Sequence, residues 1–118
     1  MANDNGTVYL VKTDNREEGI GDLLENYDMS DFKAKNVALK ANYNSADPFP
    51  ASSHPKTVQT LVRSIKEHDP SSIILAERSG MGDTRDVLET MGIIYLGEKE
   101  GFEVRVLDEE DKIGRAHV

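Results

Sequence analysis

Apolar residues along the chain alternate between short strand-like runs and stretches with helical spacing. Strand-like runs occupy residues 7–12, 37–40, 72–76 and 102–107, and they are rich in the β-branched and aromatic residues that strands favour. Between these runs, apolar residues recur at intervals of three and four, which predicts helices. The resulting β-α-β-α-β-α-β order is typical of a parallel sheet with helices packed over it.

The first predicted helix begins near Asp14. Glu17 follows three residues later, which is the spacing of a capping box, so we expect Asp14 to cap this helix. The apolar residues that follow would share one helical face: Ile20, Leu23, Leu24 and Tyr27.

The second helix has the clearest periodic signal in the chain. Pro55 suits the first helical position, where a missing N–H costs nothing, and the helix must end before Pro70. Its predicted apolar stripe consists of Val58, Leu61, Val62 and Ile65.

The run at residues 72–76 is continuously apolar, which predicts a strand covered on both faces. Either Asp83 or Thr84 caps the helix that follows, and Gly92 ends it. Residues 93–101 fit a helical turn or an extended connection, and their pattern does not decide between the two.

Right-handed crossovers in this order predict one α/β domain over residues 7–107. We expect a small Rossmann-like three-layer α/β/α sandwich, with a mainly parallel sheet of about four strands. A flexible tail over residues 1–6 and an acidic, disordered tail over residues 108–118 complete the prediction.

The amino-acid composition argues against several classes of function. The chain has 118 residues and a net charge of -8, and it lacks the clustered Lys and Arg that nucleic acid binding requires. With no cysteine it has no cysteine-ligated iron–sulfur cluster and no thiolate zinc site. Its three histidines are not paired at metal-ligand spacing, so no metal site is predicted.

No stretch of the sequence is apolar enough to predict a membrane span. The first residues contain neither a basic region nor an apolar run, so no signal peptide is predicted. We therefore expect a cytoplasmic protein that does not associate with a membrane.

Side chains that could bind a ligand or transfer a proton lie where the predicted strands end, which is where parallel sheets bind ligands. These places are residues 13–16, 40–44, 54–55 and 77–83. Lys40 offers a point charge for a carboxylate or phosphate, and Asn42 and Asn44 offer amides that orient a ligand. The alternative for both asparagines is that they only support turns.

His54 and Glu77 are the candidates for proton transfer. His54 precedes a helix N-terminus, where the dipole attracts anions and favours a neutral imidazole. The alternative for His54 is a local helix cap. Glu77 ends a strand, and its alternative is an ion pair with the neighbouring Arg78.

The loop after residue 77 contains two glycines. Backbone donors near Gly80 and Gly82 would cradle an anion, with Arg78 beside them. The Gly-Met-Gly sequence resembles the start of a dinucleotide fingerprint, but Arg85 stands where the third glycine belongs, so classical NAD binding is not predicted.

Three motifs together resemble domain-of-unknown-function family 362: LKAN at residues 39–42, SHP at residues 53–55, and IILAERSG followed by DTRDVLETMG. The similarity extends over residues 8–108. It implies an α/β fold and an association with redox or anaerobic metabolism, but no particular reaction. It also implies that Lys40, Asn42, His54, Glu77 and Gly80 occupy motif positions.

The chain departs from the family pattern in three ways. Ala41 stands where the family has proline. Family members are generally longer than this chain, and many carry ferredoxin-like cysteine clusters that it lacks.

Three functional hypotheses follow. The first is a domain that binds a small anionic molecule at the carboxyl edge of the sheet. The second is a non-catalytic accessory module that docks on a redox partner protein through its acidic flanks. The third is a structural module that forms a homodimer through an exposed sheet edge or a bare face. No cofactor and no reaction can be assigned from the sequence.

Overall fold

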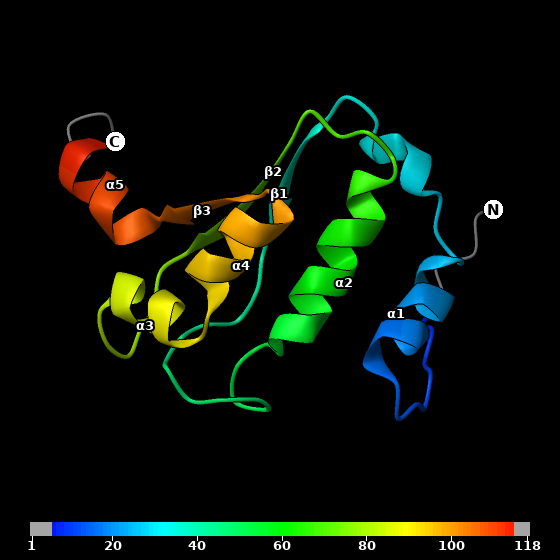
Figure 1. Cartoon of the computed structure of the whole chain (residues 1–118), viewed down its shortest axis with the longest axis horizontal. Helices are drawn as coiled ribbons and strands as arrows, with labels where there is room; N and C mark the ends of the chain where they lie inside the picture. The colour runs from blue at the N-terminus through cyan, green and yellow to red at the C-terminus, as the bar shows by residue number, and fades with distance from the viewer. Residues whose placement is uncertain (1–5, 115–118) are drawn as a thin grey trace.

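A computed structural model describes residues 6–114 of the chain (Figure 1). It is an α/β structure, as predicted. The elements are α1 (Arg16–Leu24), the 3₁₀ helix η1 (Met29–Phe32), β1 (Asn36–Leu39), α2 (Pro55–Lys66), β2 (Ser72–Glu77), α3 (Thr84–Thr90), α4 (Ile93–Glu100), β3 (Glu103–Val106) and α5 (Leu107–Gly114).

The three strands form one parallel sheet in the order β1-β2-β3. The central strand pairs Ile73 with Val37 on one side and Leu75 with Val104 on the other. Helix α2 connects β1 to β2, and α3 and α4 connect β2 to β3. The predicted parallel sheet is therefore confirmed, with three strands in the described part of the chain.

The helices that connect the strands lie on one face of this sheet. Because the strand order advances in a single direction, right-handed crossovers place every connecting helix on the same side. Helices α2 and α4 contact each other over that face, and α1 packs against α2 (Figure 1). A third layer would require the strand order to reverse at a switch point. Residues 6–114 thus form two layers, and the predicted three-layer sandwich is not found in them.

Burial along β2 reflects this one-sided covering. Ile73 and Leu75 are buried beneath the helices, whereas Ile74 and Ala76 are half-buried on the opposite face. The apolar run was predicted to be covered on both sides. In the structure only one side of the strand is fully packed.

The predicted strand over residues 7–12 was wrong, because this segment is extended but joins no ladder. Strand propensity alone cannot form a strand, since the ladder needs a neighbouring edge. In Figure 1 the segment lies beside α1, with α2 between it and the strands. Val8 and Leu10 are consequently almost fully exposed.

Helix α1 begins one residue later than predicted. Asn15, not Asp14, is the N-cap, and its Oδ1 accepts a 3.0 Å hydrogen bond from the N–H of Glu18. Of the predicted apolar stripe, Leu24 packs against the core whereas Tyr27 is more than half exposed.

Helix α2 matches its prediction, with Pro55 in its first turn and an apolar stripe directed at the sheet. The core that it covers also includes residues from the strands, from α3 and α4, and from two loops. Its buried members are Met29, Val37, Tyr43, Val58, Val62, Ile65, Ile73, Leu75, Val87, Leu88, Ile93, Leu96, Phe102 and Val106.

Asp83 is the N-cap of α3, and its carboxylate accepts a hydrogen bond from the N–H of Asp86. Gly92, at φ 77°, ends this helix as predicted. The sequence pattern of residues 93–101 fitted either a helical turn or an extended connection. In the structure residues 93–100 form helix α4.

A buried carboxylate joins α4 to α2. Glu100 accepts hydrogen bonds from Arg63 at 2.8 and 2.9 Å and from Gln59 at 3.0 Å. This arrangement holds the pKa of Glu100 at about 2, chiefly through the hydrogen bond from Arg63.

The disorder predicted for residues 108–118 was wrong for the part that the structure describes, because α5 continues to Gly114. Residues 115–118 lie outside the described part, and so does all of the predicted tail at residues 1–6 except Gly6. None of the described helices has the length and apolar character needed to cross a lipid bilayer.

Candidate functional site

The loops after β1 and β2 meet at the carboxyl edge of the sheet. They comprise residues 40–54 and 78–83, and Ser79 Oγ donates a 2.7 Å hydrogen bond to the carbonyl oxygen of Tyr43 between them. Ligands of parallel sheets bind at this edge. The structure therefore brings together two of the segments that the sequence singled out.

Glu77, the last residue of β2, joins these loops through its carboxylate. Its side chain is buried, and its two oxygens accept hydrogen bonds from the N–H of Tyr43 at 3.0 Å and the N–H of Arg78 at 2.9 Å. The hydrogen bond from Arg78 comes from its backbone N–H.

Asn44 and Gly80 also join the two loops. The N–H of Gly80 donates to Asn44 Oδ1 at 2.8 Å, and the N–H of Met81 donates to the Asn44 carbonyl oxygen at 2.9 Å. The predicted anion cradle is thus filled by Asn44 itself. Gly82 follows at φ 106°, a conformation that favours glycine.

Asn42 closes the long loop upon itself. Its N–H donates to Ser53 Oγ at 2.9 Å, and its Nδ2 donates to the Ala51 carbonyl oxygen at 3.3 Å. These contacts agree with the alternative prediction for Asn42, that its side chain supports a turn rather than orienting a ligand. Lys40 is exposed, and its Nζ donates to the carbonyl oxygen of Ala41 at 2.8 Å.

His54 is the N-cap of α2, which is the second of the two roles predicted for it, a local helix cap. Its Nδ1 accepts a 3.0 Å hydrogen bond from the N–H of Lys56, so the neutral ring carries its proton on Nε2. The edge of Phe49 packs against the imidazole with 5.5 Å between the ring centroids. The guanidinium carbon of Arg16 lies 4.6 Å from the centroid of the same Phe49 ring, a cation–π distance.

His54 also lines an open cavity of about 620 Å³ between the long loop and the end of α3. Within the described residues, no hydrogen-bond partner is present for Nε2 of His54. Apolar and small side chains predominate around the cavity: Ala46, Pro48, Phe49, His54, Pro55, Thr90 and Met91.

Helix α5 packs its acidic first turn against the loop after β2. Asp108 lies 3.6 Å from an Arg78 nitrogen and accepts a hydrogen bond from the Thr84 hydroxyl. Glu109 pairs with Arg85 through two hydrogen bonds of 2.6 and 2.7 Å, which raise the pKa of Arg85. In the sequence these residues are an acidic run directly after the last strand, a pattern that predicts a disordered tail and does not indicate the basic partners.

Tyr43 was also missed by the sequence analysis, because it stands between two asparagines in a polar loop. Its side chain is fully buried, and its hydroxyl has no hydrogen-bond partner among the described residues. Burial, and secondarily the charge of Glu77, raise the pKa of Tyr43 to about 12.

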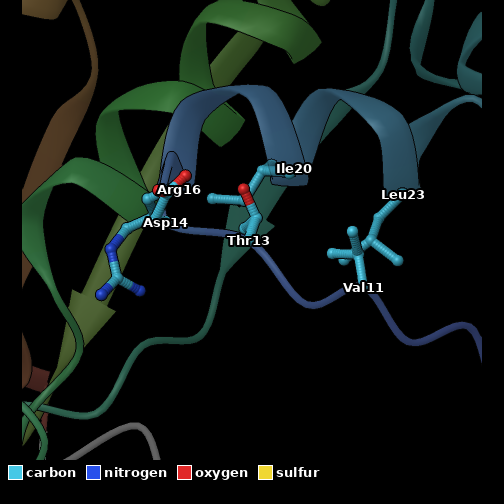
Figure 2. A pocket seen from close by; sticks show the side chains of 7 residues that line it. Val11, Thr13, Asp14, Arg16, Ile20 and Leu23 are labelled. Carbon is cyan, nitrogen blue, oxygen red and sulfur yellow. The ribbon is translucent and has the colours of Figure 1, made fainter.

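Residues 13–16, the first of the predicted strand-end places, lie at a separate cavity of about 500 Å³ beside α1 (Figure 2). Val11 and Leu23 project toward this cavity together, as do Thr13 and Ile20. It lies along α1 rather than at the sheet edge. No group of three or more His, Asp or Glu side chains within the described residues is arranged to hold a metal ion.

A protein-family model described as a domain of unknown function (DUF362) matches residues 37–116. The match therefore begins in β1 and includes both loops at the carboxyl edge as well as α5. No curated protein and no solved structure matches the chain.

Proposed function

The chain belongs to the DUF362 family of domains of unknown function, and we propose that it binds a small anionic molecule at the carboxyl edge of its sheet, in the cavity beside His54. The observation that carries this proposal is the geometry of His54. Its Nδ1 is held by the N–H of Lys56, and Nε2–H remains as a fixed donor at the cavity wall. A fixed donor on a rigid helix end binds with little loss of side-chain freedom.

Charge at this position favours an anion. The N-terminus of α2 carries the positive end of the helix dipole, and Arg16 sits over the Phe49 ring that forms part of the cavity wall. Lys40 adds an exposed positive charge after β1. The dipole and Arg16, which belongs to the predicted strand-end place at residues 13–16, support a role for His54 in holding the ligand. Lys40 does not line this cavity, and its proposed role is to attract the anion to the same edge of the sheet.

The walls of the cavity indicate what the rest of the ligand is. Pro48, Phe49 and Met91 are apolar, so an apolar body is preferred to a second charged group. A small aromatic or aliphatic carboxylate fits both requirements better than free phosphate does.

The other residues predicted at the site do not bind the ligand directly in this proposal. They are Asn42, Asn44, Glu77, Arg78, Gly80 and Gly82. The contacts of Asn44, Glu77 and Gly80 join the two loops, and Asn42 bonds within the long loop, so these residues shape the edge on which the ligand binds. We further propose that the domain acts in the cytoplasm. We also propose that it belongs to a protein of redox or anaerobic metabolism, because the resemblance to its family implies that setting. A salt-sensitive pull-down of a redox protein would support this last point.

Binding of benzoate, acetate and inorganic phosphate, followed through the NMR signals of the His54 ring, tests the ligand proposal. We expect benzoate to bind more tightly than the other two, and more weakly as salt is added. His54→Asn is the informative variant, because asparagine is a good N-cap and keeps the start of α2 intact while removing Nε2.

His54→Asn should weaken benzoate binding at least tenfold, since the fixed donor is lost. His68→Asn, at the other end of α2, is the matched control and should leave binding unchanged. Equal binding by wild type and His54→Asn, with the fold intact by circular dichroism, would exclude His54 as the ligand-binding residue.

A further inference from the structure

The segment of residues 7–12 has the composition of a strand but none of a strand's hydrogen bonds. Its sequence, TVYLVK, is rich in β-branched and aromatic residues. Among the described residues, no partner is present for any backbone N–H or C=O of this segment. An extended, unpaired segment of this kind is ready to pair with the edge of a sheet.

The side chains of the segment alternate between a partly covered side and a bare side. Tyr9 packs edge-on against Tyr27 with ring centroids 5.6 Å apart, and Val11 is half-buried at the cavity that Leu23 also lines (Figure 2). Val8 and Leu10, which point the other way, are 90% and 94% exposed. Alternation with apolar residues on both sides is typical of a strand that is covered on both faces.

The sheet has two edge strands, β1 and β3, and they differ in how well they are protected against pairing with another chain. Edge strands usually carry charges or prolines that prevent pairing with other chains. On β3, Glu103 and Arg105 pair with each other, and Arg105 also reaches Glu110 at 3.5 Å. The β1 edge, Asn36–Leu39, contains no charged residue and no proline.

We propose that residues 7–12 of one copy pair with the β1 edge of a second copy, and that the exchange is reciprocal. The product is a two-fold dimer in which each sheet gains a fourth strand, the number that the sequence pattern predicts. The packing of α1 against α2 keeps the segment beside α1 and away from its own β1 (Figure 1). A second copy can approach the segment from the bare side of Val8 and Leu10, which the chain itself leaves uncovered.

This interface goes beyond the proposed ligand site and does not depend on it. The segment lies outside residues 37–116, the part that matches the family model. Reciprocal exchange of a terminal segment is a low-cost route to a closed dimer.

Light scattering and hydrogen exchange over a range of protein concentrations test the proposal. We expect a dimer, with amide protection of residues 7–12 and of β1 rising together as the concentration rises. Leu10→Pro removes one backbone donor of the segment and should weaken the dimer at least tenfold. Because Leu10 is 94% exposed in the single chain, this change leaves the monomer folded, as circular dichroism would verify.

Tyr95→Lys, an equally drastic change at an exposed residue of α4, is the control and should leave the dimer intact. Three results would overturn the proposal. They are a monomer at every concentration, protection of residues 7–12 without protection of β1, and protection of both that does not depend on concentration. The last would mean that the segment pairs with β1 of its own chain.

Discussion

Asn44 and Gly80, which are 36 residues apart, are joined by a 2.8 Å hydrogen bond from the Gly80 N–H to Asn44 Oδ1. A Cβ atom on Gly80 would lie 2.4 Å from that oxygen. The contact thus depends on the absence of a side chain at residue 80, and it connects the loop after β1 to the loop after β2.

Gly80→Ala is expected to break this contact, because Asn44 must move away from the new methyl group. The free energy of unfolding should fall by about 1 kcal/mol, the usual value of one hydrogen bond. Urea unfolding measures the change. Gly21→Ala is the control: nothing lies within 4 Å of its Cβ position in α1, so alanine should stabilise the helix by about 0.5–1 kcal/mol. Equal effects of the two substitutions would contradict the argument.

Glu77→Gln is expected to destabilise the protein, because two backbone N–H groups donate to the buried carboxylate and an amide offers only one acceptor oxygen. The loss should be about 1–3 kcal/mol, since a buried donor would face the amide NH₂ group. Urea unfolding is again the measurement. Glu103→Gln, at an exposed residue of β3, should change stability by less than about 0.5 kcal/mol. A Glu77 variant as stable as the Glu103 variant would show that the loops do not depend on this carboxylate.

Glu100 makes stability depend on acid pH. Its pKa is about 2 in the folded protein and 4.5 in the absence of perturbation. Because folding lowers the pKa, the carboxylate contributes stability that is fully present above pH 4.5 and is lost as the pH falls toward 2. In Glu100→Gln, stability measured between pH 6 and pH 2 should fall less steeply than in wild type, from a lower starting value. Parallel curves for the two proteins would contradict this assignment.

Tyr43→Phe is expected to leave the protein as stable as wild type or to stabilise it by about 1 kcal/mol, because the buried hydroxyl that it removes has no described partner. Phenolate absorbance gives an independent check. Wild type should show an ionisation step near pH 12, and this step should be absent from the variant. A clear loss of stability in Tyr43→Phe would reveal a hydrogen bond to an internal water.

Local chemistry determined much of the fold in advance. The apolar stripe of α2 and the proline in its first turn specify that helix from neighbouring residues alone. The same is true of the end of α3 at Gly92, and the sequence limits the N-cap of that helix to Asp83 or Thr84. In these elements the decisive interactions connect residues within about four positions of each other, and such interactions are visible in a linear pattern.

Other features depend on partners that are distant in the sequence. Residues 7–12 have strand propensity, but a strand exists only where an edge is within reach, and α1 holds this segment elsewhere. Likewise, the pattern could not show that the N–H of Gly80 is already bonded to Asn44, or that α5 packs its acids against Arg78 and Arg85.

The sequence by itself therefore determined helices α1, α2 and α3, the parallel order of the strands and the family of the chain. Tertiary structure alone decided which donors at the sheet edge are used within the protein and which one, Nε2 of His54, remains at a cavity. The physical reason is that a hydrogen-bonding group is available to a ligand only when no other part of the fold has satisfied it, and that depends on contacts between distant residues.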